Sequence, residues 1–80
     1  MDILFEVEEQ NEYGKSFVGI AEEVSVGHAR IHYRGEHVAE LTGIWLVDKE
    51  GGKIGLREFA EAFFQYLKKQ GYAEHWLESE

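Results

Sequence analysis

Cysteine and proline are absent from this 80-residue chain, and no long apolar run occurs in it. Without cysteine, neither a disulfide nor a thiolate metal site can stabilise the fold. The apolar runs are far shorter than the roughly 18 residues that a membrane-spanning helix needs. No basic n-region followed by an apolar h-region opens the sequence, so we expect no secretory signal and a cytoplasmic protein.

Basic residues are also scarce, because 8 Lys and Arg stand against 16 Asp and Glu, which leaves a net charge of -8. This balance disfavours nonspecific binding to nucleic acid or to an anionic membrane, so we expect neither as a partner. The hydrophobic fraction of 44% and the aromatic fraction of 14% are typical of a folded chain. The length predicts a single domain over residues 1–80, and a core this small needs close packing or an oligomer.

The strongest pattern in the sequence lies in residues 56–69, LREFAEAFFQYLKK. Its apolar residues recur at the spacing of one helix face: Leu56, Phe59, Ala60, Phe63 and Leu67. Gly71 follows the last of them, where the left-handed position after a helix favours glycine. Gly55 stands at the N-cap without a side-chain oxygen. An isolated helix of this length is marginal in water, so we expect it to lie on a sheet.

Alternating apolar and polar residues before the helix predict that sheet. Four strands are expected, in residues 3–8, 16–26, 28–34 and 37–47. Gly27 separates the second strand from the third, and the pair Glu22 and Glu23 marks a bulge or a break in the second.

The fourth predicted strand has two uncertain features. An interruption is expected near Thr42 and Gly43, and residues 37–41 alternatively form a short helical turn. In a five-strand version of the sheet, residues 53–55 add a short strand before the helix.

These elements predict an α+β protein, an antiparallel β-meander of four to five strands followed by a C-terminal amphipathic helix packed on one face. A small curled barrel plus the helix is the alternative architecture. The pattern does not decide which face of the sheet the helix covers.

Four basic side chains share one face of the third predicted strand: His28, Arg30, His32 and Arg34. They are candidates for binding an anion or a partner's acidic group, because arginine presents a planar fork of donors. The alternative is a cross-strand charge ladder with Glu6, Glu22 or Glu40, in which each pair contributes about 0.2–1 kcal/mol. The ladder is the more frequent arrangement, because charge runs usually lie on solvated faces.

Aromatic residues are more numerous than one small sheet–helix core requires. We therefore expect some of them at the surface, where exposed aromatic side chains indicate an interface. The interface candidates are Phe64, Tyr66 and Trp76.

Residues 48–59, DKEGGKIGLREF, look like a calcium-binding EF-hand loop. Registering Glu58 as the last ligand places Lys49 and Gly51 where the ion needs oxygen ligands, so no calcium site is expected. His28 and His32 are about 13 Å apart along a strand, too far for one metal ion.

Catalytic patterns are equally scarce. No serine occupies a Gly-x-Ser-x-Gly turn, and no glycine-rich phosphate-binding loop is present. Glu36 with His32 and His37 is the least unfavourable cluster for acid–base chemistry. We expect no catalytic residue, no cofactor and no metal.

The stretch ILFEVEEQNEYGKSFVGIAE, residues 3–22, resembles the opening hairpin of the small hic-type antitoxins. The likeness consists of a strand, an acidic turn containing glycine, and a second strand. In that family the helix follows sooner, whereas here residues 28–53 intervene, and no DNA-binding segment is visible. The resemblance therefore assigns no family.

The sequence favours a small acidic, non-catalytic binding protein that self-associates, as a homodimer in the simplest case, or binds another protein. An antitoxin- or immunity-type inhibitor of a basic partner is one alternative, because complementary charge speeds such encounters. A small-ligand-binding module is the other, with Arg30, His32 and Trp45 near the ligand.

Overall fold

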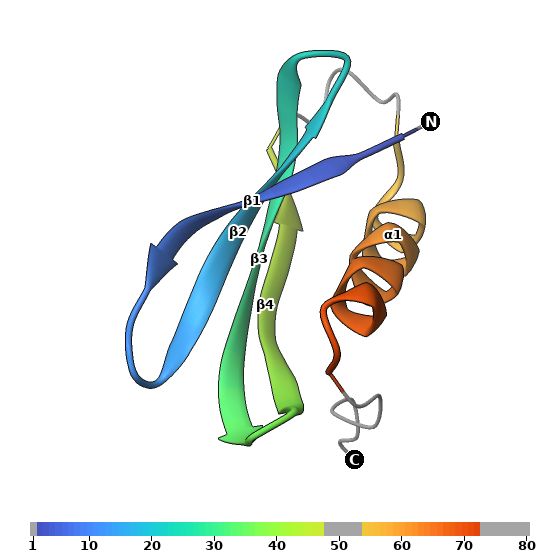
Figure 1. Ribbon diagram of the computed structural model, residues 1–80. Helices are drawn as coiled ribbons and strands as arrows, with labels where there is room; N and C mark the ends of the chain where they lie inside the picture. Colours follow the sequence, from blue (N-terminus) through green and yellow to red (C-terminus); the bar gives the residue numbers. More distant parts are fainter. Residues whose placement is uncertain (1, 48–53, 73–80) are drawn as a thin grey trace.

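The computed structural model describes residues 2–47 and 54–72, which form four antiparallel strands and one helix (Figure 1). The strands are β1 (Leu4–Gln10), β2 (Gly14–Ala21), β3 (Val24–Gly35) and β4 (Val38–Leu46), and the helix is α1 (Leu56–Lys69). The strands pair in chain order, and α1 lies against one face of the sheet. This confirms the predicted α+β meander, and the sheet is not closed into the alternative barrel.

A tight turn joins β2 to β3. Glu22 and Glu23 separate the paired residues Ala21 and Val24, and their φ angles are 54° and 68°. Positive φ at both central residues gives a two-residue hairpin turn whose twist matches that of the strands. The predicted strand over residues 16–26 therefore ends at Ala21, and the break predicted at Glu22 and Glu23 is confirmed as a hairpin turn.

Three further features of the sheet differ from the expectation or refine it. Gly27, predicted to separate two strands, lies inside β3. β4 includes Val38 and continues to Leu46, which excludes the helical-turn alternative for that segment. Thr42 has no partner in the β3–β4 pairing, so the predicted interruption is a β-bulge within a continuous strand.

Helix α1 begins and ends at the predicted residues. The described residues contain no fifth strand between β4 and α1. Lys53, the first residue of the predicted short strand, lies outside the described residues. Gly55 caps the N-terminus without a side-chain hydrogen bond. At the other end Gly71 has a φ of 94°, and the Tyr72 N–H donates to the Leu67 carbonyl over 3.1 Å. This is the hydrogen-bonding pattern of a helix that ends at a left-handed glycine.

The centre of the core is a phenylalanine ring lying on bare backbone. Gly19 and Gly27 are paired across β2 and β3. A Cβ atom at Gly19 would lie 2.5 Å from Cε1 of Phe59, and one at Gly27 would lie 2.8 Å from its Cζ. Phe59 is completely buried, so its ring occupies the space that side chains at these two positions would fill.

Phe63 continues the buried stripe of α1 toward the β1–β2 edge of the sheet. Its ring centroid lies 5.2 Å from that of Phe5 and 5.3 Å from that of Phe17, both in edge-to-face geometry. Such pairs contribute about 0.5–1.5 kcal/mol beyond burial of their area. Leu56, the first residue of the predicted stripe, is 48% exposed and lies outside the core.

Replacing Gly19 with alanine is expected to destabilise the fold by about 1–3 kcal/mol, because the methyl group overlaps the buried ring of Phe59. Equilibrium urea unfolding measures the change. Gly35→Ala is the control, since a Cβ there meets Val38 only at 3.8 Å, and its effect is expected to stay below about 1 kcal/mol. Equal destabilisation by both variants would contradict the steric role of Gly19.

Relieving the β2–β3 turn is expected to stabilise the protein. The double change Glu22→Asn with Glu23→Gly places residues that tolerate positive φ at both positions and should raise the unfolding free energy by about 1–2 kcal/mol. The control Glu22→Gln with Glu23→Gln removes the same charges but keeps the unfavourable side chains. A thermal melt in which the control gains as much as the Asn–Gly variant would assign the effect to charge instead.

Candidate functional site

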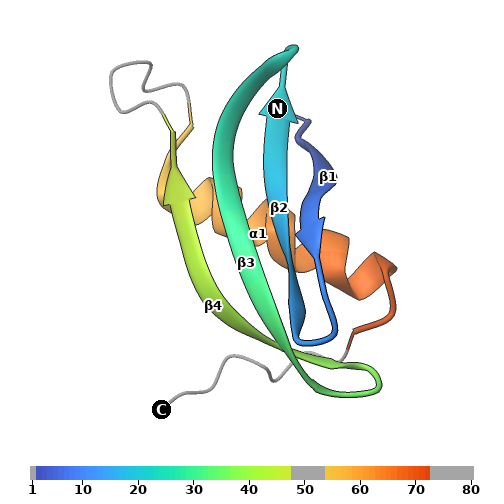
Figure 2. The ribbon, with the colours of Figure 1, turned by 90° about the vertical axis from the view of Figure 1, so that its left-hand side faces the viewer.

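The sheet face opposite α1, which we call the open face, carries two rows of side chains that cross all four strands. Figure 2 views this face with the helix behind the sheet, and no described segment lies in front of it. The His28 row consists of Glu6, Val18, His28 and Trp45, and the Arg30 row consists of Glu9, Ser16, Arg30 and Gly43. These residues alternate with buried ones such as Phe17 and Ala29, so they point away from the helix.

In the His28 row, the His28 ring is held between an acid and an aromatic ring. Its Nδ1 lies 2.9 Å from Oε1 of Glu8, and since a carboxylate only accepts, Nδ1–H is the donor. The same ring stacks on Trp45, with centroids 5.5 Å apart and planes inclined by 23°. His28 therefore supports the Trp45 ring, which remains 43% exposed.

The Arg30 row brings a cation to the same tryptophan. Cζ of Arg30 lies 5.7 Å from the Trp45 ring centroid, a cation–π contact worth about 0.5–1 kcal/mol at an exposed site. Gly43 leaves the space for it, because a Cβ there would lie 3.1 Å from the Trp45 ring and 3.4 Å from Nη2 of Arg30. The Thr42 hydroxyl donates to the Arg30 carbonyl over 3.1 Å and fixes the bulge beside it.

Arg30 differs from the other arginines in its charge partners. Nε of Arg34 lies 2.6 Å from Oε1 of Glu40, and Nε of Arg57 lies 4.0 Å from Oε2 of Glu61. Arg30 forms no ion pair with any residue that the structure describes. In a chain of net charge -8, an exposed arginine oriented by a tryptophan but lacking a carboxylate is available for an external anion.

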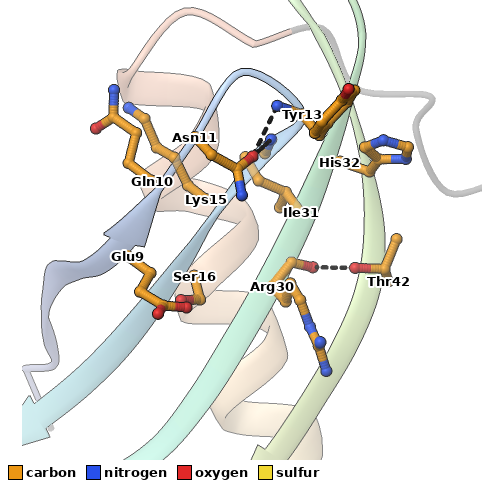
Figure 3. Close-up of a pocket in the computed structure, with 11 residues that line it drawn as sticks. Glu9, Gln10, Asn11, Tyr13, Lys15, Ser16, Arg30, Ile31, His32 and Thr42 are labelled. Carbon is orange, nitrogen blue, oxygen red and sulfur yellow. Dashed lines mark hydrogen bonds between the residues drawn. The ribbon is translucent and has the colours of Figure 1, made fainter.

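A hollow of about 280 Å³ lies beside the Arg30 row, next to the turn between β1 and β2 (Figure 3). Asn11 shapes this turn, because its Oδ1 accepts from the N–H groups of Tyr13 and Gly14 over 2.7 and 3.1 Å. The Arg30 side chain extends away from Tyr13 and His32 instead of closing over the hollow. The volume is just below the range of about 300–1,000 Å³ that is usual for small-molecule sites.

The four residues of the predicted basic run differ in whether they form ion pairs. Two of its members pair with glutamates, His28 with Glu8 and Arg34 with Glu40, as a charge ladder requires. His32 pairs across the sheet with Glu40, and its ring centroid lies 6.4 Å from that of Tyr13. Neither His32 nor Arg30 forms an ion pair within the described residues, and Arg30 is the arginine of the run that lacks a carboxylate partner.

Of the three aromatic interface candidates, the structure describes Phe64 and Tyr66. Phe64 is half-buried and packs against the core. The Tyr66 ring lies 5.2 Å from Phe5 and 5.6 Å from Phe17 between centroids, and burial, with a smaller effect of Tyr72, raises the pKa of its hydroxyl. Trp76 lies outside the described residues.

The sequence pattern did not identify three residues of the open-face cluster. Gly43 looked only like a strand interruption, and Glu9 and Ser16 looked like parts of a polar turn and an ordinary strand. They become neighbours of Arg30 only through the register of the three strand pairs. One sequence signal could have identified Gly43. It directly precedes the apolar run that contains Trp45, and Trp45 is exposed in the structure.

Metal and acid–base chemistry gain no support from the described residues. No group of three or more His, Cys, Asp or Glu side chains in them is arranged to hold a metal ion, and this includes Glu36, His32 and His37. Half of the EF-hand-like stretch, residues 48–53, lies outside the described part.

The fold and site define a two-layer α+β protein with one helix-covered and one open sheet face. No helix within the described ranges is long and apolar enough to cross a membrane. Comparison with protein-family models, curated proteins and solved structures found no match to this chain. The surface of the chain itself must therefore carry any functional assignment.

The Arg30–Trp45 contact has a spectroscopic signature. We expect the side-chain protons of Arg30 to resonate upfield of those of Arg57, because they lie over the Trp45 ring whereas Arg57 is almost fully exposed on α1. Trp45→Leu is expected to abolish the difference with a stability loss of about 1 kcal/mol or less. Proton NMR of both proteins makes the comparison, and an unchanged Arg30 shift in the variant would refute the contact.

Proposed function

We propose that this protein is a non-catalytic interaction protein whose open face contacts protein, with a second copy of the same chain as the partner. The observation that carries the proposal is the exposed Trp45, held in place by His28 and Arg30 on the sheet face that α1 does not cover. Ordered aromatic side chains and arginines are enriched at protein interfaces.

Apolar residues around the cluster support the same use. Leu4 is 61% exposed and pairs across the sheet with Ile20. This is the next pair on the open face after Glu6–Val18. Val18 lies beside them on β2, and Trp45 lies beyond His28 in the row of Val18, so that charged side chains of the two rows border these apolar residues. An apolar centre with a polar rim is the usual anatomy of an interface.

The size of the face suits a small dimer. Four strands about 4.8 Å apart and about 25 Å long give about 500 Å² of flat area per copy. The corrugation of side chains raises the buried accessible area, so two faces together hide about 1,000–1,500 Å². Specific interfaces begin at about 1,200 Å², which makes a weak to moderate dimer the expected state.

Self-association is tested by removing the exposed tryptophan. Wild-type protein is expected to form dimers in sedimentation equilibrium and native mass spectrometry, and Trp45→Ser is expected to weaken the dimer at least tenfold. Leu56→Ser is the matched control, because Leu56 is 48% exposed, close to the 43% of Trp45, but lies on α1.

The outcome separates the open face from general surface hydrophobicity. A wild-type chain that stays monomeric up to millimolar concentration would overturn self-association. Equal weakening by Trp45→Ser and Leu56→Ser would show that the contact does not use the open face.

A further inference from the structure

The Arg30 row contains both an unpaired cation and an unpaired anion, on two strands that are not neighbours. Glu9 on β1 and Arg30 on β3 are separated by Ser16, and neither forms an ion pair within the described residues. The neighbouring acid Glu8 is already used by His28. We infer that, in the dimer on which the proposed function rests, Glu9 of each copy pairs with Arg30 of the other.

Symmetry decides which strands face each other in such a dimer. Two sheets packed face to face keep their strands within about 30° of alignment. A two-fold axis perpendicular to the strands would place β1 over β1 and β3 over β3. The acidic side chains of β1 would then face β1 of the other copy and the basic side chains of β3 would face β3, and like charges in apposition are destabilising.

A two-fold axis parallel to the strands reverses the strand order instead. It places β1 of one copy over β4 of the other and β2 over β3, while each cross-strand row stays at its own level. Glu9 then faces Gly43 of the second copy, and the opposite contact is identical, as an isologous interface requires.

The arginine is already directed toward that meeting point. Its Nη2 would lie 3.4 Å from a Cβ at Gly43, and its Cζ lies over Trp45, so the guanidinium leans from β3 onto β4. Packed sheets are about 10 Å apart, a gap that an extended arginine and a glutamate span together. Ser16 and Gly43 carry little or no side chain and leave the row open between them.

Charge placement also explains how two chains of net charge -8 can associate. Repulsion between the distant acidic groups is screened over about 8 Å at physiological ionic strength, whereas pairs inside a contact are screened much less. Two Glu9–Arg30 pairs per dimer place attraction where the screening is weakest. The charge arrangement favours this partner over nucleic acid, which would meet the full acidic field.

Charge reversal at each end of the pair provides the test. Arg30→Glu puts two glutamates at each contact of its homodimer, and Glu9→Arg puts two arginines there, so each variant alone is expected to dimerise at least tenfold more weakly than wild type. Mixing the two variants restores opposite charges at both contacts. Native mass spectrometry of the equimolar mixture is expected to show mainly heterodimer, and the double variant is expected to regain a homodimer close to wild type in affinity.

The controls keep this result separate from that of the proposed function. Glu9 and Arg30 are exposed, so both variants are expected to fold, which circular dichroism verifies. Arg57→Glu changes an arginine that is 92% exposed on α1 and is expected to leave the dimer unchanged. Arg30→Gln and Glu9→Gln, which introduce no repulsion, are each expected to weaken the dimer to a smaller extent.

Two failures can be told apart. A monomeric wild-type chain overturns the proposed function itself. A wild-type dimer whose charge-reversed variants mix without preference for the heterodimer, or whose glutamine variants keep wild-type affinity, overturns the Glu9–Arg30 pair and leaves the open-face dimer standing.

Discussion

The contact of the Phe59 ring with the glycine pair of β2 and β3 is the constraint on which the architecture depends. Gly19 and Gly27 leave the centre of the sheet without side chains. The helix therefore approaches the backbone closely, and the Phe59 ring is completely buried. A two-layer protein of this size has only one core to stabilise it. A Cβ atom at Gly19 or Gly27 would point toward α1. Because both positions lack one, this is the sheet face that the helix can approach closely.

Helix α1 covers one face of the sheet, and the alternation of side chains along each strand decides which residues lie on the open face. Residues next to the buried Phe17 and Ala29 must point outward, which places Val18, Ser16 and Arg30 together on the open face. Neutralisation of charge on that face is incomplete. A surface that orders a tryptophan and leaves an arginine without a carboxylate is better suited to contact than to solvation alone, and this is the physical basis of the interaction proposed here.

Strong local patterns were sufficient for the overall fold. The helix over residues 56–69 follows from its apolar spacing and Gly71, and the strands follow from alternation, because both signals reflect side-chain periodicity alone. The break at Glu22 and Glu23 was predicted but its tight turn was not, since the positive φ angles are imposed by the strands on either side and not by a preference of glutamate. The site was predictable only in part: the basic run was identified, but not that Arg30 would be its arginine without a carboxylate partner.

By itself, the sequence determined the class of this protein: an acidic chain with a four-strand meander, a C-terminal helix and a basic run on one strand. Only the tertiary structure decided which charges pair, because ion pairs depend on strand register and bulges, which bring Glu8 to His28 and Glu40 to Arg34. It also decided that Trp45 lies exposed beside Arg30 instead of in the core. Periodicity assigns a residue to a face of its own strand, whereas the neighbour on the next strand is set by packing of the whole sheet against Phe59.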